Sequence, residues 1–141
     1  MSQRKVILLL GSNIKNPKKN IEEAILLIEK RLGAIIKKSQ MLETEPVEFA
    51  SSNIFCNIAV LLETQISPIQ ILTEVKSIEK AMGRISDSKE LGGYEDRVID
   101  IDVVSIGNIT YKSRRLDIPH YKHVHERDFS QVLLREIGIT K

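Results

Sequence analysis

The sequence is poor in cysteine, in tryptophan and in long apolar runs. Its one cysteine, Cys56, allows no disulfide within the chain, so a reducing compartment is expected. The apolar run Val6–Leu10 is far too short to cross a bilayer or to form a signal peptide. With no Trp, three Phe and three Tyr, the core must be mainly aliphatic. We therefore expect a cytoplasmic protein that does not bind membranes.

An excess of positive charge is also missing. The chain has 21 Lys and Arg against 19 Asp and Glu, which leaves a net charge of only +2. A general nucleic-acid binder would show a basic excess, so that class is disfavoured. The sequence contains no repeats and no low-complexity segments. Its 141 residues are expected to form one domain, residues 1–141.

Apolar periodicity and capping residues predict a mixture of strands and helices. Strands are expected at Lys5–Leu10, Ala34–Leu42, Ile54–Thr64 and Arg97–Val104, with a short one at Ile109–Tyr111; helices are expected at Pro17–Leu32, Pro68–Met82 and Asp128–Ile137. This order is a split βαβ pattern, which predicts an α+β fold with an antiparallel sheet and helices packed on one face. The other face of the sheet would then be available for ligands.

The strand Arg97–Val104 carries two aspartates, although aspartate is depleted in strands. Alternation places Asp100 and Asp102 on one face, about 6.5–7 Å apart. Two carboxylates at that spacing can share Mg²⁺, which usually binds one or two carboxylates together with substrate phosphates. The alternative is the solvent-exposed face of an amphipathic strand, because Asp-x-Asp is a short motif.

The strand Ile54–Thr64 also has two different faces. The face that contains Cys56 is purely apolar, so Cys56 is predicted to be a core residue. The opposite face begins with Phe55 and Asn57. A ring and an amide at these positions can stack on a heterocycle and hydrogen-bond its edge, or they can be a core residue and a strand-end cap.

The helix that ends at Met82 places a carboxylate beside its apolar stripe. Leu72, Val75, Ile78 and Met82 form the predicted stripe, and Glu79 lies at its edge. A carboxylate so close to the core needs a partner or a ligand.

Residues 84–127 contain eight Lys and Arg, eight Asp and Glu, and all three histidines, so this region is densely charged without a net charge. His120, His123 and His125 lack helical i, i+4 spacing and have no cysteine partners, so a zinc site is disfavoured. Phosphoryl-type transfer instead needs metals, cations and in-line positioning. The candidates for the cations are Arg84, Arg97, Arg115, His120 and Arg127.

Several of these residues form an ordered set that covers nearly the whole chain. The set comprises Gly11-Ser12-Asn13, Phe55-x-Asn57, Glu79-x₄-Arg84, Arg97-x-x-Asp100-x-Asp102, and Arg115-x₃-Pro119-His120 followed by Arg127 and Phe129. In this order and combination it resembles 6-hydroxymethyl-7,8-dihydropterin pyrophosphokinase of folate biosynthesis.

The resemblance implies a ferredoxin-like fold and a reaction. Pyrophosphate would pass from ATP to the hydroxymethyl group of 6-hydroxymethyl-7,8-dihydropterin, with release of AMP. Asp100 and Asp102 would bind two Mg²⁺ ions that bridge the ATP phosphates, and Arg84 and Arg97 would assist the transfer.

The resemblance also implies two sets of substrate contacts. The residues for ATP would be Glu79, Arg115, His120, Tyr121 and Arg127. Phe55 and Phe129 would stack on the two faces of the pterin. Asn57 and the backbone around Thr44 and Val47 would hydrogen-bond to the edge of the pterin.

The residues alone also allow two other interpretations of the function. A metal-dependent nucleotidyltransferase would also place paired aspartates on a strand, but it would release pyrophosphate. A non-catalytic ferredoxin-like module could read RNA on its sheet, although the chain lacks an aromatic pair on adjacent strands for that purpose. In all cases a monomer or weak dimer is expected, with ATP and the pterin as small-molecule partners of the enzyme.

Overall fold

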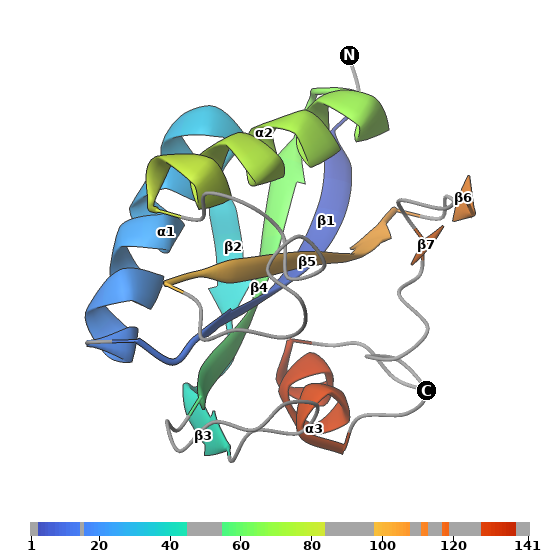
Figure 1. The fold of residues 1–141 in the computed structure, drawn as a ribbon. Coiled ribbons are helices and arrows are strands. Elements are labelled where there is room, and N and C mark those ends of the chain that lie inside the picture. Colours follow the sequence, from blue (N-terminus) through green and yellow to red (C-terminus); the bar gives the residue numbers. More distant parts are fainter. Residues whose placement is uncertain are drawn as a thin grey trace.

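The computed structural model describes residues 3–14, 16–44, 55–83, 98–107, 111–112, 117–118 and 128–137. Along the chain the elements are β1 (Arg4–Ser12), α1 (Pro17–Arg31), β2 (Ile35–Lys38), β3 (Leu42–Thr44), β4 (Phe55–Thr64), α2 (Pro68–Ala81), β5 (Asp100–Ile106), β6 (Tyr111–Lys112), β7 (Asp117–Ile118) and α3 (Asp128–Glu136). Figure 1 shows their arrangement.

The main sheet has the strand order β2-β4-β1-β5, and β3 extends it by pairing with β4. Each of these pairings is antiparallel. Two helices, α1 and α2, connect the strands in a repeated strand–helix–strand order. This is the ferredoxin-like arrangement, so the predicted fold class is confirmed. β6 and β7 form a separate two-stranded sheet, of which β7 was not predicted.

One face of the sheet packs against α1 and α2 and forms the larger core. The side chains of this core are almost all aliphatic, including the fully buried Leu8 and Leu10 of β1, Ile21 of α1 and Ile78 of α2. Burying one such side chain contributes about 1.5–3 kcal/mol. No helix among the described residues is both long and apolar enough to cross a membrane.

The starts of both helices follow their predicted caps. The Asn16 side chain accepts a hydrogen bond from the Lys19 amide, and Pro17 occupies the first turn. Ser67 and Gln70 form a reciprocal capping box at α2, with bonds of 3.2 and 3.1 Å. Local residues therefore fix the positions at which the helices begin.

The opposite face of the sheet is partly covered by α3. Its Leu133, Leu134 and Ile137 form a second, smaller core with apolar side chains of β1, β4 and β5, among them Leu9 and Ala59. The prediction that the helices pack on one face is therefore correct for α1 and α2 and wrong for α3, which lies on the other face (Figure 1). What remains of this second face beside α3 is where the candidate site lies.

The strand predicted at Ala34–Leu42 is broken into β2 and β3, which corrects that prediction. Ser39 causes the break: its amide donates to the Ala59 carbonyl, while its hydroxyl accepts from the Ala59 amide, each at 2.9 Å. A side chain thus takes the place of one backbone acceptor. Beyond the break, β3 resumes antiparallel pairing with β4, with Leu42 opposite Asn57.

The buried stripe of α2 also differs from its prediction by one residue. Ile71 is fully buried, whereas the predicted Leu72 is half-buried. Val75, Ile78 and Glu79 are buried, and Met82 is partly buried against the same core. Neighbouring residues of similar hydrophobicity do not reveal the exact rotation of a helix.

Candidate active site

The register of the sheet brings the predicted residues of two different strands into one row. Asn57 on β4 pairs with Gly11 on β1, and Gly11 pairs with Asp100 on β5. Directly paired residues point to the same face, and adjacent strands lie about 4.8 Å apart. The Cα atoms of Asn57 and Asp100 are therefore about 10 Å apart, with only a glycine between them.

Asp102 follows Asp100 on the same side of β5. Ile99, Ile101 and Val103 lie in the core with α1 and α2, so the predicted alternation of this strand is confirmed. Both carboxylates are half-buried on the opposite face. Among the described residues, no three or more His, Cys, Asp and Glu side chains gather into a metal site. The pair nevertheless fits Mg²⁺, because that ion commonly takes its other ligands from phosphates and water.

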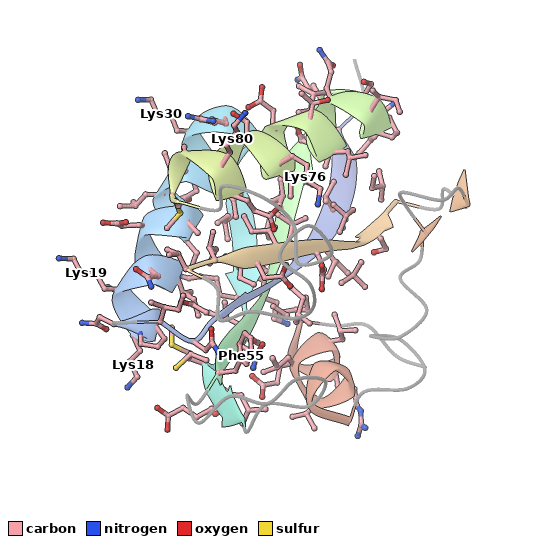
Figure 2. All side chains as sticks on the ribbon, viewed as in Figure 1. Lys18, Lys19, Lys30, Phe55, Lys76 and Lys80 are labelled. Carbon is pink, nitrogen blue, oxygen red and sulfur yellow. The ribbon has the colours of Figure 1, made fainter. Side chains whose placement is uncertain are left out.

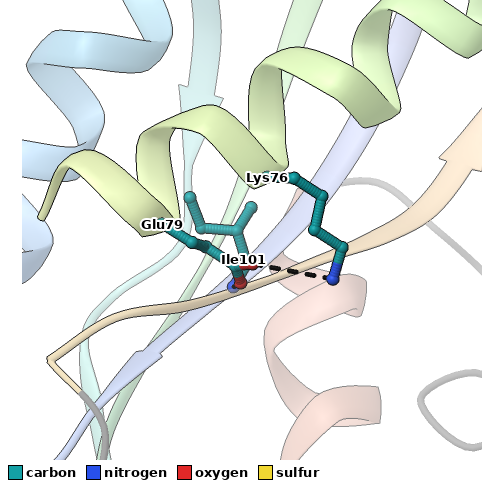
Figure 3. Close-up of polar contacts among 3 residues, drawn as sticks. All are labelled: Lys76, Glu79 and Ile101. Carbon is teal, nitrogen blue, oxygen red and sulfur yellow. Dashed lines mark hydrogen bonds and ion pairs between the residues drawn. The ribbon is translucent and has the colours of Figure 1, made fainter. Parts of the chain in front are cut away.

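Glu79 lies on α2, with a side chain that is only 2% exposed. One carboxylate oxygen, Oε2, accepts a hydrogen bond of 2.7 Å from the backbone N–H of Ile101. The other, Oε1, lies 3.6 Å from the ammonium of Lys76 (Figure 3). Among the described residues β5 is the last strand of the main sheet, so Glu79 supplies a hydrogen-bond acceptor at the edge strand. The prediction that Glu79 needs a partner is confirmed.

Phe55 lies at the start of β4 (Figure 2), and its ring and the Asn57 amide both lie beside Gly11. A Cβ atom on Gly11 would be 2.9 Å from Asn57 Oδ1 and 3.5 Å from ring atom Cδ1 of Phe55. Asn57 is 6% exposed, while Phe55 is half-buried. The amide and the ring are therefore packed side by side on the face that carries the two aspartates.

β3 adds a further predicted residue to this end of the sheet. Thr44 pairs with Phe55, and Leu42 pairs with Asn57. The Thr44 backbone thus lies beside that of Phe55, and its role in ligand binding stays a prediction. Phe129 belongs to the first turn of α3, which packs on the same face of the sheet.

Cys56 points to the opposite face and is a core residue, as predicted, with 3% exposure. Burial raises the pKa of its thiol, and the negative charge of Glu43 raises it further, while Lys18 opposes the shift. The sulfur lies 4.0 Å from Glu43 Oε2. A thiol with a raised pKa is a poor nucleophile at neutral pH, which agrees with a structural role.

The remaining predicted site residues lie outside the described residues. They are Val47, Arg84, Arg97, Arg115, His120, Tyr121 and Arg127. Their assignments stay predictions.

Sequence reasoning missed two features of this region. Gly11 falls just beyond the predicted strand Lys5–Leu10, whereas in the structure it belongs to β1 and lies under Asn57. A glycine at the end of an apolar strand can mark a close approach, and that signal was present. The second feature is Glu136 of α3, which binds the backbone and side chain of Gln40 at 2.8 and 2.9 Å.

Comparisons with known proteins identify the family. A family model described as 7,8-dihydro-6-hydroxymethylpterin-pyrophosphokinase (HPPK) matches residues 7–139. A 2-amino-4-hydroxy-6-hydroxymethyldihydropteridine pyrophosphokinase of Porphyromonas gingivalis is 34% identical over 135 residues, which is 94% of this chain and 90% of that protein. The protein of the same name from Haemophilus influenzae is 30% identical, over 92% of this chain and 78% of its own length.

A solved structure supports the fold. The wild-type Plasmodium falciparum HPPK-DHPS crystal structure with pteroate matches with a TM-score of 0.72 at 18% identity. The match covers 96% of this chain but only 39% of the Plasmodium chain. At this identity the likeness concerns the fold alone. Because the family model and the two bacterial relatives each match most of the sequence, this chain belongs to the 7,8-dihydro-6-hydroxymethylpterin-pyrophosphokinase family.

Proposed function

We propose that this chain transfers pyrophosphate from ATP to the hydroxymethyl group of 6-hydroxymethyl-7,8-dihydropterin, in folate biosynthesis, and that it releases AMP. One observation carries the residue-level proposal. The aspartate pair and the Phe55–Asn57 pair lie on the same face of one sheet, separated by Gly11. This arrangement supports the proposal, because a phosphate-binding part and a heterocycle-binding part of one site would then be adjacent.

Asp100 and Asp102 would hold two Mg²⁺ ions through their carboxylate oxygens, the donor type that this hard cation prefers. When bound, these ions would neutralise negative charge on the triphosphate and in the transition state. The chain's own contribution is a rigid support. β5 is paired with β1 on one edge, and Glu79 binds its Ile101 N–H. The two carboxylates thus have little freedom to move apart.

The pterin would be held on the other side of Gly11. The Asn57 amide can donate and accept hydrogen bonds along the edge of the heterocycle, together with the backbone around Thr44 and Val47. Phe55 and Phe129 would stack on its two faces. A ligand fixed in this way would direct its hydroxymethyl arm across Gly11 toward Asp100. Positioning of this kind supplies much of the catalysis in phosphoryl-type transfer.

The nucleotide would be bound by the remaining family-matched residues. Arg84 and Arg97 would stabilise charge that develops on the transferred group. The other predicted contacts to ATP are Glu79, Arg115, His120, Tyr121 and Arg127. Of these, Glu79 has a described contact with the protein itself, at Ile101.

The products of a single reaction test the proposal. The purified protein is incubated with Mg²⁺, ATP and 6-hydroxymethyl-7,8-dihydropterin, and nucleotides are separated by chromatography. AMP that forms only when the pterin is present is the expected result. ADP alone, or no pterin-dependent AMP, would reject the proposal. Release of free pyrophosphate with the nucleotide attached to an acceptor would instead support a nucleotidyltransferase.

We further propose that residues 1–141 act as a single catalytic domain, as a monomer or weak dimer, without nucleic acid. Light scattering during size-exclusion chromatography, over a range of protein concentrations, would measure the mass. A stable higher oligomer at low concentration would contradict this part.

A further inference from the structure

Gly11 lies in a regular strand, and its backbone does not require glycine. The residue pairs with strands on both sides, through Asn57 on β4 and Asp100 on β5. The positive-φ glycines of the described chain are Gly83 and Gly107, and Gly11 is not among them. An alanine could therefore adopt the same backbone conformation. The reason for glycine must be sought in what surrounds it.

The space beside Gly11 is filled by two side chains of the candidate site. A Cβ atom there would come within 2.9 Å of Asn57 Oδ1 and within 3.5 and 3.6 Å of two ring atoms of Phe55. Non-bonded carbon and oxygen atoms do not approach as closely as 2.9 Å without strain. The Phe55 distances are ordinary contact. An alanine would therefore displace the Asn57 amide first and leave the ring nearly unmoved.

Gly33 offers an instructive contrast. A Cβ atom on Gly33 would overlap the backbone carbonyl oxygen of Glu63, so this glycine lets α1 end close against β4. The neighbour of Gly33 is main chain, whereas the neighbours of Gly11 are an amide and a ring on the site face. The close approach at Gly33 therefore serves helix–strand packing, whereas the close approach at Gly11 serves the candidate site.

We propose that Gly11 is a positioning residue of the pterin site. Without a side chain, it lets the Asn57 amide lie over β1, where that amide reads the hydrogen-bonding edge of a flat heterocycle. It also means that β1 places no side chain of its own between Asn57 and Asp100, whose Cα atoms lie about 10 Å apart. A fused two-ring ligand can thus lie across β1 with its one-carbon arm toward the aspartates. This inference rests on the proposed function and deepens it.

Gly11→Ala tests the inference by separating the two substrates. The KM for the pterin should rise about tenfold, as expected for the loss of one well-aligned hydrogen bond. The KM for ATP should change less than about twofold, because neither residue beside Gly11, Asn57 or Phe55, is a predicted ATP contact. In direct titration, the affinity of the variant for a non-hydrolysable ATP analogue should stay close to that of the wild-type protein. Far-ultraviolet circular dichroism and the Tm would establish that the variant is folded.

A matched glycine controls for general damage. Gly107→Ala places an alanine at a φ of +52°, where nothing lies within 4 Å of its Cβ. The backbone N–H of Gly107 donates a hydrogen bond to the carbonyl oxygen of Lys5, at the other end of β1. Its substitution should lower the Tm without raising the KM for the pterin. Equal increases of both KM values in Gly11→Ala, with a Tm as low as that of Gly107→Ala, would overturn the inference.

A double-mutant cycle shows whether Gly11 acts through Asn57. Asn57→Ala removes the amide, so adding Gly11→Ala should raise the KM for the pterin by less than about twofold more. Independent, multiplicative effects would overturn the inference, as would a wild-type KM in the single variant. If the wild-type protein itself forms no pterin-dependent AMP, the proposed function fails. Normal wild-type turnover with an unaffected Gly11→Ala variant refutes the positioning role alone.

Discussion

The Glu79 carboxylate accepts a hydrogen bond of 2.7 Å from the backbone N–H of Ile101, the residue between Asp100 and Asp102. Hydrogen bonds to an ionised acceptor are stronger than those between neutral groups. Glu79 comes from α2, on the core side of the sheet, while the two aspartates project from the other face. A buried carboxylate on one side of β5 therefore holds the backbone that carries the predicted metal ligands on the other.

Glu79→Ala and Glu79→Gln are expected to differ. Alanine leaves the Ile101 N–H without this acceptor, which costs about 1–3 kcal/mol for a buried group. Glutamine keeps an oxygen that can accept the bond and loses the ion pair with Lys76, whose side chain is 59% exposed and so contributes little. Thermal unfolding should show a large decrease in Tm for alanine and a small one for glutamine.

The same two variants separate support of β5 from contact with ATP. If Glu79 acts through Ile101, the glutamine variant should retain most of the AMP-forming activity and its dependence on Mg²⁺. If the negative charge itself is needed at the nucleotide, glutamine should lose as much activity as alanine while its Tm stays high. Activity assays across a Mg²⁺ titration would distinguish the two outcomes.

Asp100→Asn and Asp102→Asn should each abolish turnover while preserving the fold. Loss of a hydrogen-bond partner around metal ligands already costs about 10–100-fold, and loss of a ligand should cost more. Asparagine matches aspartate in shape, and it removes the repulsion between two like charges on one face. The Tm should therefore stay the same or rise slightly.

Glu63→Gln provides the matched control for these two variants, because it neutralises a carboxylate far along β4, opposite Lys5. AMP formation in this control should remain near that of the wild-type protein. Near-normal turnover in either aspartate variant would contradict the assignment of the pair as metal ligands.

The sequence was sufficient wherever neighbouring residues decide the structure. The faces of β4 and β5 follow from strict alternation, so Cys56 could be placed in the core and Asp100 on the opposite face. The starts of α1 and α2 follow from Asn16 and Ser67, because their side chains accept hydrogen bonds from backbone N–H groups in the first turn of each helix. These features depend on residues a few positions apart.

The features that escaped prediction depend on residues that are distant in the chain. The break at Ser39 exists because its hydroxyl meets the amide of Ala59, twenty positions later. The bonds between Gln40 and Glu136 join residues 96 positions apart. The meaning of Gly11 depends on which way the Asn57 side chain lies across the neighbouring strand. Patterns within one segment carry no information on such contacts.

Glu136→Ala is expected to weaken the attachment of α3 to the sheet. Its two oxygens accept from the Gln40 backbone N–H and side-chain amide, and both residues are exposed. The buried Leu133 and Leu134 remain, so the loss of stability should be about 0.5–1.5 kcal/mol. Because Phe129 is predicted to stack on the pterin from the same helix, the KM for the pterin should rise more than the KM for ATP.

Gln40→Ala tests whether the side chains of Gln40 and Glu136 stabilise the protein through the same contact. The backbone bond to Glu136 survives in that variant, so its effect should be smaller, and the double variant should lose less than the sum of the two. Arg135→Ala, at the neighbouring exposed position of α3, should leave both KM values unchanged. Additive effects of Gln40→Ala and Glu136→Ala would contradict the pairing.

Cys56 should make the stability of the protein depend on pH in the alkaline range. Burial, followed by the charge of Glu43, raises the pKa of this thiol above its ordinary value of 9.0. The folded state therefore holds the thiol proton more tightly than the unfolded state does. This contribution to stability is complete below the unfolded pKa, and it is lost as the pH rises through the folded pKa. The loss amounts to at most about 1.4 kcal/mol per pH unit.

The difference in unfolding free energy between wild-type protein and Cys56→Ala, measured by urea titration from pH 7 to 10.5, isolates this contribution. The wild-type advantage should shrink above pH 9, because other titrating groups cancel in the difference. Iodoacetamide should modify folded protein far more slowly than urea-unfolded protein. Glu43→Gln should speed alkylation only modestly, since burial is the larger cause of the shift. Rapid alkylation of the folded wild-type protein at pH 7 would show an accessible thiolate and contradict the assignment of Cys56 to the core.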